Sequence, residues 1–299
     1  MELPEFPYIP DEVIRQSKEH GDFAPVFFEW YKYVGRLALL VSNIERNQPN
    51  VSQHTTAHDF HILIGLLCRC ARLMFSNVVM SHEGRFGEST AIVDRCILES
   101  SIKVIWLCES QTVDAFKRYT ADGLKAELEL KDNILDAVEK RQGRALTIET
   151  RMLKSIDQCI ERSGLTKEDI LAAKKLPNIA SMLEQLGFNR LPYIVTQKIG
   201  SHHVHGTWVS LWTHYLTETA DGVAIPRDSD CETHVNQYIV VSKLVLQAIR
   251  SFVQSIFEQT DTATFFFEII TSAESEIDSI FRLDMEDDTK TETQENEFG

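Results

Sequence analysis

The chain has little proline and glycine, 8 and 13 residues among 299. Both residue types interrupt helices, so their scarcity leaves room for long helical segments. Apolar residues recur along most of the chain with the period of an amphipathic helix. We therefore predict an all-α fold, a single multi-helix bundle of about nine to eleven helices that forms one domain over residues 1–283.

Cysteine pairs and long apolar runs are also missing. The six cysteines form no Cys-x-x-Cys pair and lie mostly in apolar helical runs, which argues against a disulfide framework or a metal site. The amino terminus lacks a basic segment followed by an apolar one, and the longest apolar run, near residues 62–68, is far shorter than a bilayer span. We expect a cytoplasmic protein with no membrane contact, no metal and no cofactor.

Charge is distributed unevenly. The formal net charge of −15 disfavours indiscriminate binding to a phosphate backbone. Residues 284–299 hold seven acids and one lysine without an apolar period, which predicts an acidic, disordered tail. Residues 140–190 hold ten Lys/Arg against six Asp/Glu and are interpreted as a locally basic helical insertion. Such a face contacts nucleic acid, complements an acidic neighbour or is merely solvated.

Two long helical segments, 54–80 and 84–110, are predicted to form a central antiparallel hairpin because only a short connection separates them. The second segment is apolar on nearly all sides, which is typical of a buried helix. Five of its charged residues fall in one narrow stripe: Arg85, Glu88, Arg95, Glu99 and Lys103. This stripe must be paired, exposed along one edge or part of a cavity lining, because unpaired buried charge costs several kcal/mol.

The first segment carries a polar stripe of its own, which includes Arg69 and Arg72. With the turn centred near residue 82, Arg72 would reach Glu88 and Arg69 would reach Glu99 across the hairpin, forming a shared polar seam. An Arg–carboxylate cluster of this kind binds phosphate or orients a general acid or base. The alternative is a structural ion-pair network that fixes the register of the helices.

A second constellation is the run Ser201-His202-His203-Val204-His205-Gly206. If Ser201 caps a helix, the histidines occupy its first turn, where the dipole favours an anion and keeps imidazole neutral. A neutral histidine in that place would serve as a general base. The spacing is a poor zinc signature. The alternative is that one or two of these histidines hydrogen-bond in the core and the others are exposed.

Common catalytic motifs are absent. The sequence has no Gly-rich phosphate loop, Rossmann fingerprint, Gly-x-Ser-x-Gly elbow or kinase signature, which removes several enzyme classes. His54, His58 and His61 share a helical face but lack the glutamate of a His-Glu-x-x-His metal motif, so a half-exposed polar edge is the better interpretation.

Four segments stand out together: Arg95-Cys-Ile-Leu-Glu99, Phe116-Lys-Arg118-Tyr119, Ile179-Ala-Ser-Met-Leu-Glu and Ser201-x-x-Val204-His205-Gly206. Over residues 55–220 they resemble a bacterial helical family catalogued only as a domain of unknown function. The resemblance implies that one polar centre contains Arg95, Glu99, Arg118, Tyr119, Ser201 and His205. Position 202, often acidic in that family, is histidine in this chain.

That family is in turn similar to the HEPN group of helical proteins, many of them ribonucleases of toxin and phage-defence systems. HEPN nucleases carry an arginine followed shortly by a histidine on a late helix, usually across a dimer. Here the late helix offers Lys198-x-x-x-His202. The resemblance implies RNA or a nucleotide as the ligand and a homodimer as the assembly.

We therefore predict that the central hairpin and the His-bearing helix form a buried polar pocket for a phosphate-containing ligand, most concretely for RNA cleavage. The catalytic residues in this prediction are His205, Arg95, Glu99 and His202. The ligand-binding residues are Arg118, Tyr119, Glu88, Ser201, His203, Arg69 and Arg72. The alternative is a non-catalytic helical module whose ion pairs are structural and whose acidic surface meets a protein partner.

Overall fold

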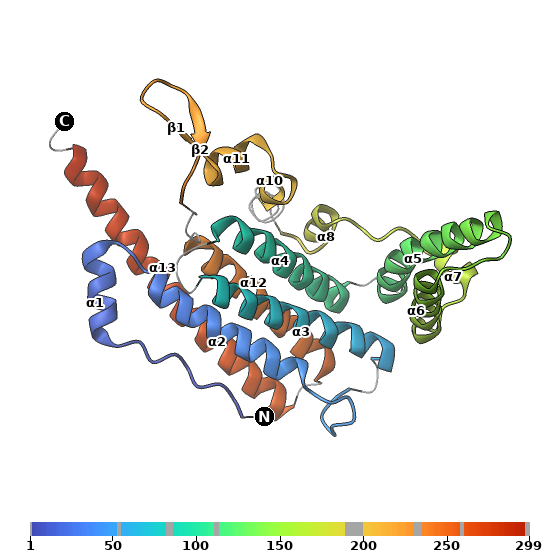
Figure 1. Cartoon of the computed structure of the whole chain (residues 1–299). Helices are drawn as coiled ribbons and strands as arrows, with labels where there is room; N and C mark the ends of the chain where they lie inside the picture. Colours follow the sequence, from blue (N-terminus) through green and yellow to red (C-terminus); the bar gives the residue numbers. More distant parts are fainter. Residues whose placement is uncertain are drawn as a thin grey trace. The chain divides into compact units, whose positions relative to one another are not determined.

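The computed structural model describes residues 2–52, 55–81, 86–110, 114–188, 200–229, 235–257 and 260–296, and the side chains of these residues except 235, 236 and 285–296. The chain divides into two compact units (Figure 1). Unit 1 comprises Met1–Glu109 and Ile179–Gly299, and unit 2 comprises Ser110–Asn178. This is a division by packing, so folding of residues 1–283 as one domain stays a prediction.

The described residues form twelve helices, which confirms the all-α prediction and exceeds its upper count by one. Those of unit 1 are α1 (Asp11–His20), α2 (Ala24–Ser42), α3 (Ala57–Met80), α4 (Gly87–Glu109), α8 (Ile179–Gln185), α10 (Gly200–His205), α11 (Trp208–His214), α12 (Val235–Ile256) and α13 (Asp261–Asn296). Those of unit 2 are α5 (Ala115–Lys140), α6 (Thr147–Ser163) and α7 (Lys167–Ala172). One antiparallel pair of short strands, β1 (Leu216–Glu218) and β2 (Ala224–Pro226), follows α11.

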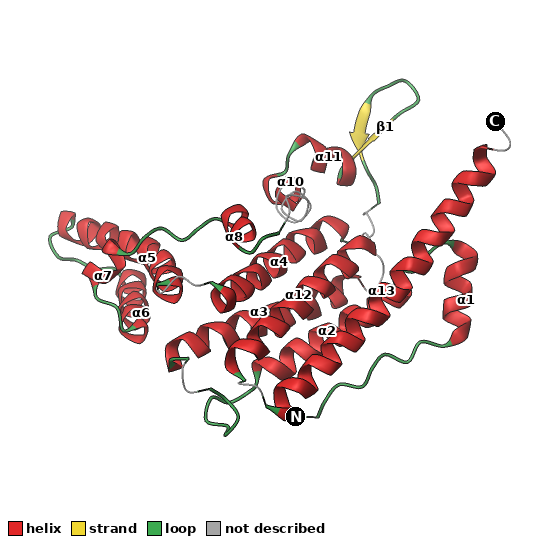
Figure 2. Ribbon diagram, turned by 180° about the vertical axis from the view of Figure 1, so that it is seen from behind, coloured by secondary structure: helices red, strands yellow, loops and turns green. Residues whose placement is uncertain are grey.

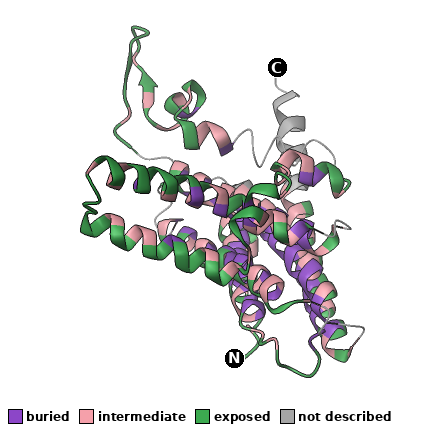
Figure 3. Ribbon diagram, turned by 90° about the vertical axis from the view of Figure 1, so that its right-hand side faces the viewer, coloured by how far each residue is buried: buried purple, intermediate pink, exposed green. Residues whose placement is uncertain are grey.

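The core of unit 1 is a helical bundle in which α3 and α4 form the predicted antiparallel hairpin. Helix α2 packs on α3, and α12 packs on both α2 and α4 (Figure 2). Buried residues gather along these helices (Figure 3). The largest side chains with almost no exposed surface include Tyr31, Phe60, Trp106 and Phe252, one from each of the four helices. Burial of such aromatic and aliphatic surface is the main favourable term in folding.

The predicted polar seam between α3 and α4 is wrong. Arg72 is exposed, and the Arg69 Nε donates 3.2 Å to the Ser100 hydroxyl, with no ion pair between Arg69 and Glu99 among the described residues. Helix α3 instead turns Leu63, Leu67 and other apolar side chains into the bundle. Its polar stripe faces outward because burying the aliphatic face is favourable and burying guanidinium groups is costly. His61 is exposed and His58 is half-buried, as the polar-edge interpretation predicts, and His54 lies outside the described residues.

The last helix continues further than the sequence suggests. Helix α13 is helical in its backbone as far as Asn296, so it includes most of the segment 284–299 for which a disordered tail is predicted. Glu, Gln and Lys are good helix formers, and extending a helix that is already nucleated costs little. The absence of an apolar face therefore argues against packing of this segment on the bundle, but it does not exclude a helix.

Two helices of the described part are long and apolar enough to cross a membrane by length and composition alone: α3 and Gln237–Ile256 within α12. Of their most apolar windows, 39% and 61% are buried inside the protein, and the core helices of soluble proteins pass the same test. The cytoplasmic location and the absence of membrane contact stay predictions.

Unit 2 has a small core of its own. Ala121, Leu124 and Leu128 on α5 pack with Ile170 of α7, and Ile160 of α6 joins them. Some cations of the predicted basic segment 140–190 form ion pairs within unit 2. Arg141 pairs with Glu149 of α6, and Lys167 pairs with Asp132 of α5. Complementing acidic neighbours is thus one role of this segment.

Helix α7 begins with a reciprocal capping box. The Thr166 hydroxyl accepts from the Asp169 backbone N–H at 3.1 Å, and the Asp169 carboxylate accepts from the Thr166 N–H at 3.2 Å. We expect Thr166→Ala to lower the free energy of unfolding by about 1 kcal/mol because this N-cap is lost. Circular dichroism during urea unfolding measures the change. Thr150→Ala, which removes an exposed threonine inside α6, is the control and should change little; equal effects of the two variants would contradict the capping role.

Candidate functional site

The polar stripe of α4 is covered by α10, which lies 106 residues further along the chain. The Arg95 Nε donates to Glu99 Oε1 at 3.1 Å, and its Nη1 donates to the Ser201 Oγ at 2.8 Å. The side chains of Arg95 and Glu99 are 19% and 29% exposed. Lys103 is a looser neighbour, 3.9 Å from Glu99. The sequence-predicted residues Arg95, Glu99 and Ser201 are therefore in one place.

Gly200 lies where α10 approaches Arg95 of α4. A Cβ added to Gly200 would lie 3.4 Å from both the Cβ and the Cδ of Arg95. At this distance a Cβ makes ordinary van der Waals contact, so alanine would fit here and only a larger side chain would press on Arg95. The same residue begins the helix that carries Ser201 and the histidines.

Glu88, at the beginning of α4, makes a second set of contacts. One carboxylate oxygen accepts a hydrogen bond from the hydroxyl of Ser210, and the other accepts from the hydroxyl of Tyr215. Ser210 is completely buried, whereas Tyr215 is about half exposed. Glu88 thus anchors α11 and the residue after it to α4.

His203 and His214 form a pair beside this carboxylate. The Nδ1 of His203 lies 3.2 Å from the Nε2 of His214, so one ring donates and the other accepts. Burial of His203 lowers its pKa, with the neighbouring His214 and His202 acting in the same direction and Glu88 opposing them. A depressed pKa keeps His203 neutral near pH 7 and able to accept a proton.

The other two histidines of α10 take no part in these contacts. The Nδ1 of His202 lies 2.8 Å from the Thr207 hydroxyl, a contact that ties α10 to the start of α11. His205 is exposed, and no hydrogen bond or ion pair of its side chain is found among the described residues. Its role as general acid or base stays a prediction, whereas His203 is the α10 histidine that lies in the cluster.

Of four other predicted ligand-binding residues, two are on α3 and two belong to unit 2. Arg69 and Arg72 are on the outer side of α3. Arg118 and Tyr119 are on α5 in unit 2, where the Arg118 Nη2 donates to the Lys175 carbonyl at 2.6 Å. This contact fixes the segment that follows α7 to α5, so the structure gives Arg118 a local structural role.

The sequence analysis missed a buried carboxylate in the bundle. Asp94 is 4% exposed, and its Oδ1 accepts from the Asn77 amide at 2.5 Å and from the Tyr31 hydroxyl at 3.2 Å. Burial raises the pKa of Asp94 to about 7, against the effect of the two hydrogen bonds. Burial also raises the pKa of Tyr31 well above its usual value. The only sequence signal was a single acid on an otherwise apolar helix face.

Ser210, His214 and Tyr215 were not predicted as site residues either. Ser210 and His214 are four residues apart, so they share one face of α11. That spacing was visible in the sequence, but which face would meet α4 depends on how the chain returns to the bundle. We use the name α10–α11 cluster for Glu88, Arg95, Glu99, Ser201, His203, Ser210, His214 and Tyr215.

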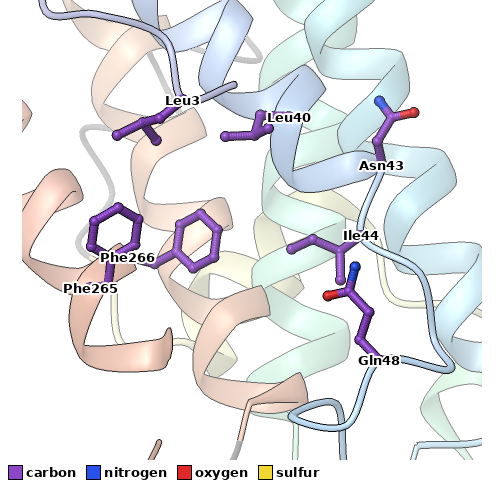
Figure 4. Close-up of a pocket in the computed structure, with 7 residues that line it drawn as sticks. All are labelled: Leu3, Leu40, Asn43, Ile44, Gln48, Phe265 and Phe266. Atoms are coloured by element: carbon purple, nitrogen blue, oxygen red, sulfur yellow. The ribbon is translucent and has the colours of Figure 1, made fainter. Parts of the chain in front are cut away.

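A cavity of about 280 Å³ lies in another part of unit 1 (Figure 4). Its lining is mostly apolar and comes from the amino-terminal arm, the end of α2 with the segment after it, and the start of α13: Leu3, Leu40, Asn43, Ile44, Gln48, Phe265 and Phe266. None of the α10–α11 cluster residues lines it. Among the described residues, no group of three or more His, Cys, Asp or Glu side chains could hold a metal ion.

The comparison with protein families gives one finding. The model of a family of unknown function, DUF5677, matches residues 60–223, which overlaps the 55–220 segment singled out from the sequence. No curated protein and no solved structure matches the chain. The match lends no support to the HEPN similarity, which stays a prediction.

Proposed function

Since the chain belongs to DUF5677, a family of unknown function, we propose its function from the site itself. We propose that the α10–α11 cluster binds a phosphate-containing ligand, most concretely RNA, and promotes its cleavage. The observation that carries this proposal is Arg95, a partly exposed guanidinium held in place by Glu99 and Ser201. A pre-oriented guanidinium suits the geometry of phosphate oxygens.

The histidine pair supplies the proton chemistry in this proposal. His203, kept neutral by burial, would accept the proton of an attacking hydroxyl, and His214 would hold the ring in place through their hydrogen bond. Arg95 would stabilise the negative charge that develops on the phosphate. Glu88 would fix α11, and with it His214, against α4.

The exposed apolar surface of α10, α11 and the two strands favours a second function. Several large apolar side chains between residues 204 and 225 are exposed: Val204, Trp208, Val209, Leu211, Tyr215, Val223 and Ile225. Concentrated apolar exposure is typical of protein–protein contact sites. We propose, as the alternative, that this surface binds a protein partner and that the α10–α11 cluster only holds it in place.

RNA binding and cleavage by purified variants separate the two proposals. We expect Arg95→Ala to weaken binding of total RNA about ten- to hundredfold, because one charged contact is worth about 1.5–3 kcal/mol. His203→Gln should lose cleavage and keep binding. Gel analysis and filter binding measure the two effects.

Two further variants serve as controls. Arg36→Ala removes an exposed cation outside the cluster and should leave RNA binding unchanged. Ser201→Ala breaks the contact between α10 and Arg95 but keeps the guanidinium. We expect Ser201→Ala to weaken binding less than Arg95→Ala does, because the positive charge remains and Glu99 still orients it. An equal loss would mean that the charge of Arg95 contributes nothing of its own, and the phosphate-binding proposal would fail. Wild-type protein that neither binds nor cleaves RNA would overturn the proposal outright.

A further inference from the structure

The outer face of α6 carries three cations that form no ion pair with the described residues. Ile156 is 2% exposed and marks the inward side of the helix. At 100° per residue, Arg151, Lys154 and Arg162 fall within an arc of about 80° on the outward half of the helix. All three are exposed, and no hydrogen bond or ion pair of their side chains is found among the described residues. We use the name α6 face for these three residues.

The acids of unit 2 do not cancel this face. Residues 110–178 hold 13 Lys/Arg and 12 Asp/Glu, so the unit is almost neutral within a chain of net charge −15. The two acids nearest the inward side of α6 are already engaged: Glu149 with Arg141 and Asp157 with Lys131. Glu161, the one exposed acid of α6 outside an ion pair in the described structure, lies on the same outward side and offsets one of the three positive charges. Because Glu149 and Asp157 are paired with other cations, the α6 face keeps a net positive charge.

We propose that the α6 face binds the phosphodiester backbone of a single nucleic-acid strand. The argument is charge complementarity: three exposed cations outside ion pairs, against one exposed acid, lie along about 16 Å of helix, given a rise of 1.5 Å per residue. At physiological salt, screening over about 8 Å hides the distant acids of the chain but not these cations from a strand in contact with them.

An anionic membrane is the competing occupant, and the helix argues against it. A membrane-surface helix turns its apolar face outward, whereas α6 turns Ile156 inward to the core of unit 2. The exposed aliphatic residues Leu146 and Ile148 lie only at the beginning of α6. The outward arc of Arg151, Lys154 and Arg162 offers charge without apolar surface, which suits a phosphate backbone.

This inference takes its class of ligand, a nucleic acid, from the proposed function. It concerns binding by unit 2 and does not depend on cleavage. Binding of fluorescein-labelled oligouridine and oligothymidine is measured by anisotropy over a series of KCl concentrations. The variant is Arg151→Gln/Arg162→Gln. The matched control, Lys18→Gln/Arg36→Gln, removes two exposed cations from unit 1 and changes the net charge equally.

We expect the slope of log affinity against log salt to fall by about 1.4 in the α6 variant, since each strand contact contributes about 0.7. The control should keep the wild-type slope, and oligothymidine should behave as oligouridine does because the backbone is shared. Equal slopes for both variants would overturn the proposal. Binding to phosphatidylserine vesicles is measured in parallel. If the α6 variant loses affinity only for these vesicles and not for the oligonucleotides, the proposal is also overturned. Loss of RNA cleavage in Arg95→Ala is measured separately from this slope. The proposed function and the α6 proposal can therefore fail independently of each other.

Discussion

Asp94→Asn should remove a pH dependence of stability that the wild-type protein shows between about pH 4 and pH 7. The folded protein holds the Asp94 proton up to a pKa of about 7, whereas the unfolded chain releases it near its ordinary value of 3.8. The folded state therefore binds more protons in this window, and the free energy of unfolding falls as pH rises through it. The total effect is about 4 kcal/mol, from a shift of about three pKa units.

The quantity to measure is the difference in unfolding free energy between variant and wild type, from urea unfolding at several pH values. Other carboxylates titrate equally in both proteins, so they cancel in this difference. We expect Asp94→Asn to gain about 3 kcal/mol of this total relative to wild type between pH 4.5 and pH 8. The new amide can donate to the Asn77 Oδ1, a buried atom that accepts no hydrogen bond in the structure.

Tyr31→Phe is the control for this assignment. It removes one hydrogen bond to the Asp94 carboxylate, and that bond lowers the pKa of Asp94. The pH dependence should therefore remain and extend to higher pH. Parallel stability curves for wild type and Asp94→Asn would show that Asp94 stays ionised in the folded protein, contrary to the effect expected from its burial.

The hairpin of α3 and α4 could be predicted because it depends on features local to the sequence. Long apolar segments with few helix breakers give two buried helices, and a short connection makes them antiparallel. Which side of α3 would face α4 was predicted wrongly, since charge matching between Arg72 and Glu88 was weighed above aliphatic burial. The energies favour the opposite choice, because apolar area dominates and solvated guanidinium groups cost nothing.

The candidate site was predictable in part for a similar reason. Arg95 and Glu99 are four residues apart on one helix, so their contact is a property of the helix itself. The family resemblance placed Arg95 and Ser201 in one polar centre, and the structure has the two side chains in contact. Asp94 could not be found this way because its partners Asn77 and Tyr31 are 17 and 63 residues away and come from two other helices. Such partners are set by tertiary packing alone.

Glu88→Ala should release α11 from α4. Ser210 is completely buried, and its hydroxyl would lose the carboxylate that accepts its hydrogen bond. Leaving such a group without an acceptor costs about 1–3 kcal/mol. Because the contact joins a peripheral helix to the bundle, we expect local opening rather than global unfolding. Amide hydrogen exchange should become faster over residues 200–215 and stay unchanged in α12.

The double-mutant cycle with Ser210→Ala tests whether the carboxylate and the hydroxyl act on each other. If the hydrogen bond carries the effect, removing both partners should cost less than the sum of the single losses, by about 1 kcal/mol. Glu88→Gln keeps an acceptor oxygen and should lie between wild type and Glu88→Ala. Additive losses, or faster exchange throughout the bundle, would mean that Glu88 acts on the fold as a whole. Then neither His203 nor His214 would owe its position to this carboxylate, and the proton chemistry proposed for the α10–α11 cluster would lose its structural support.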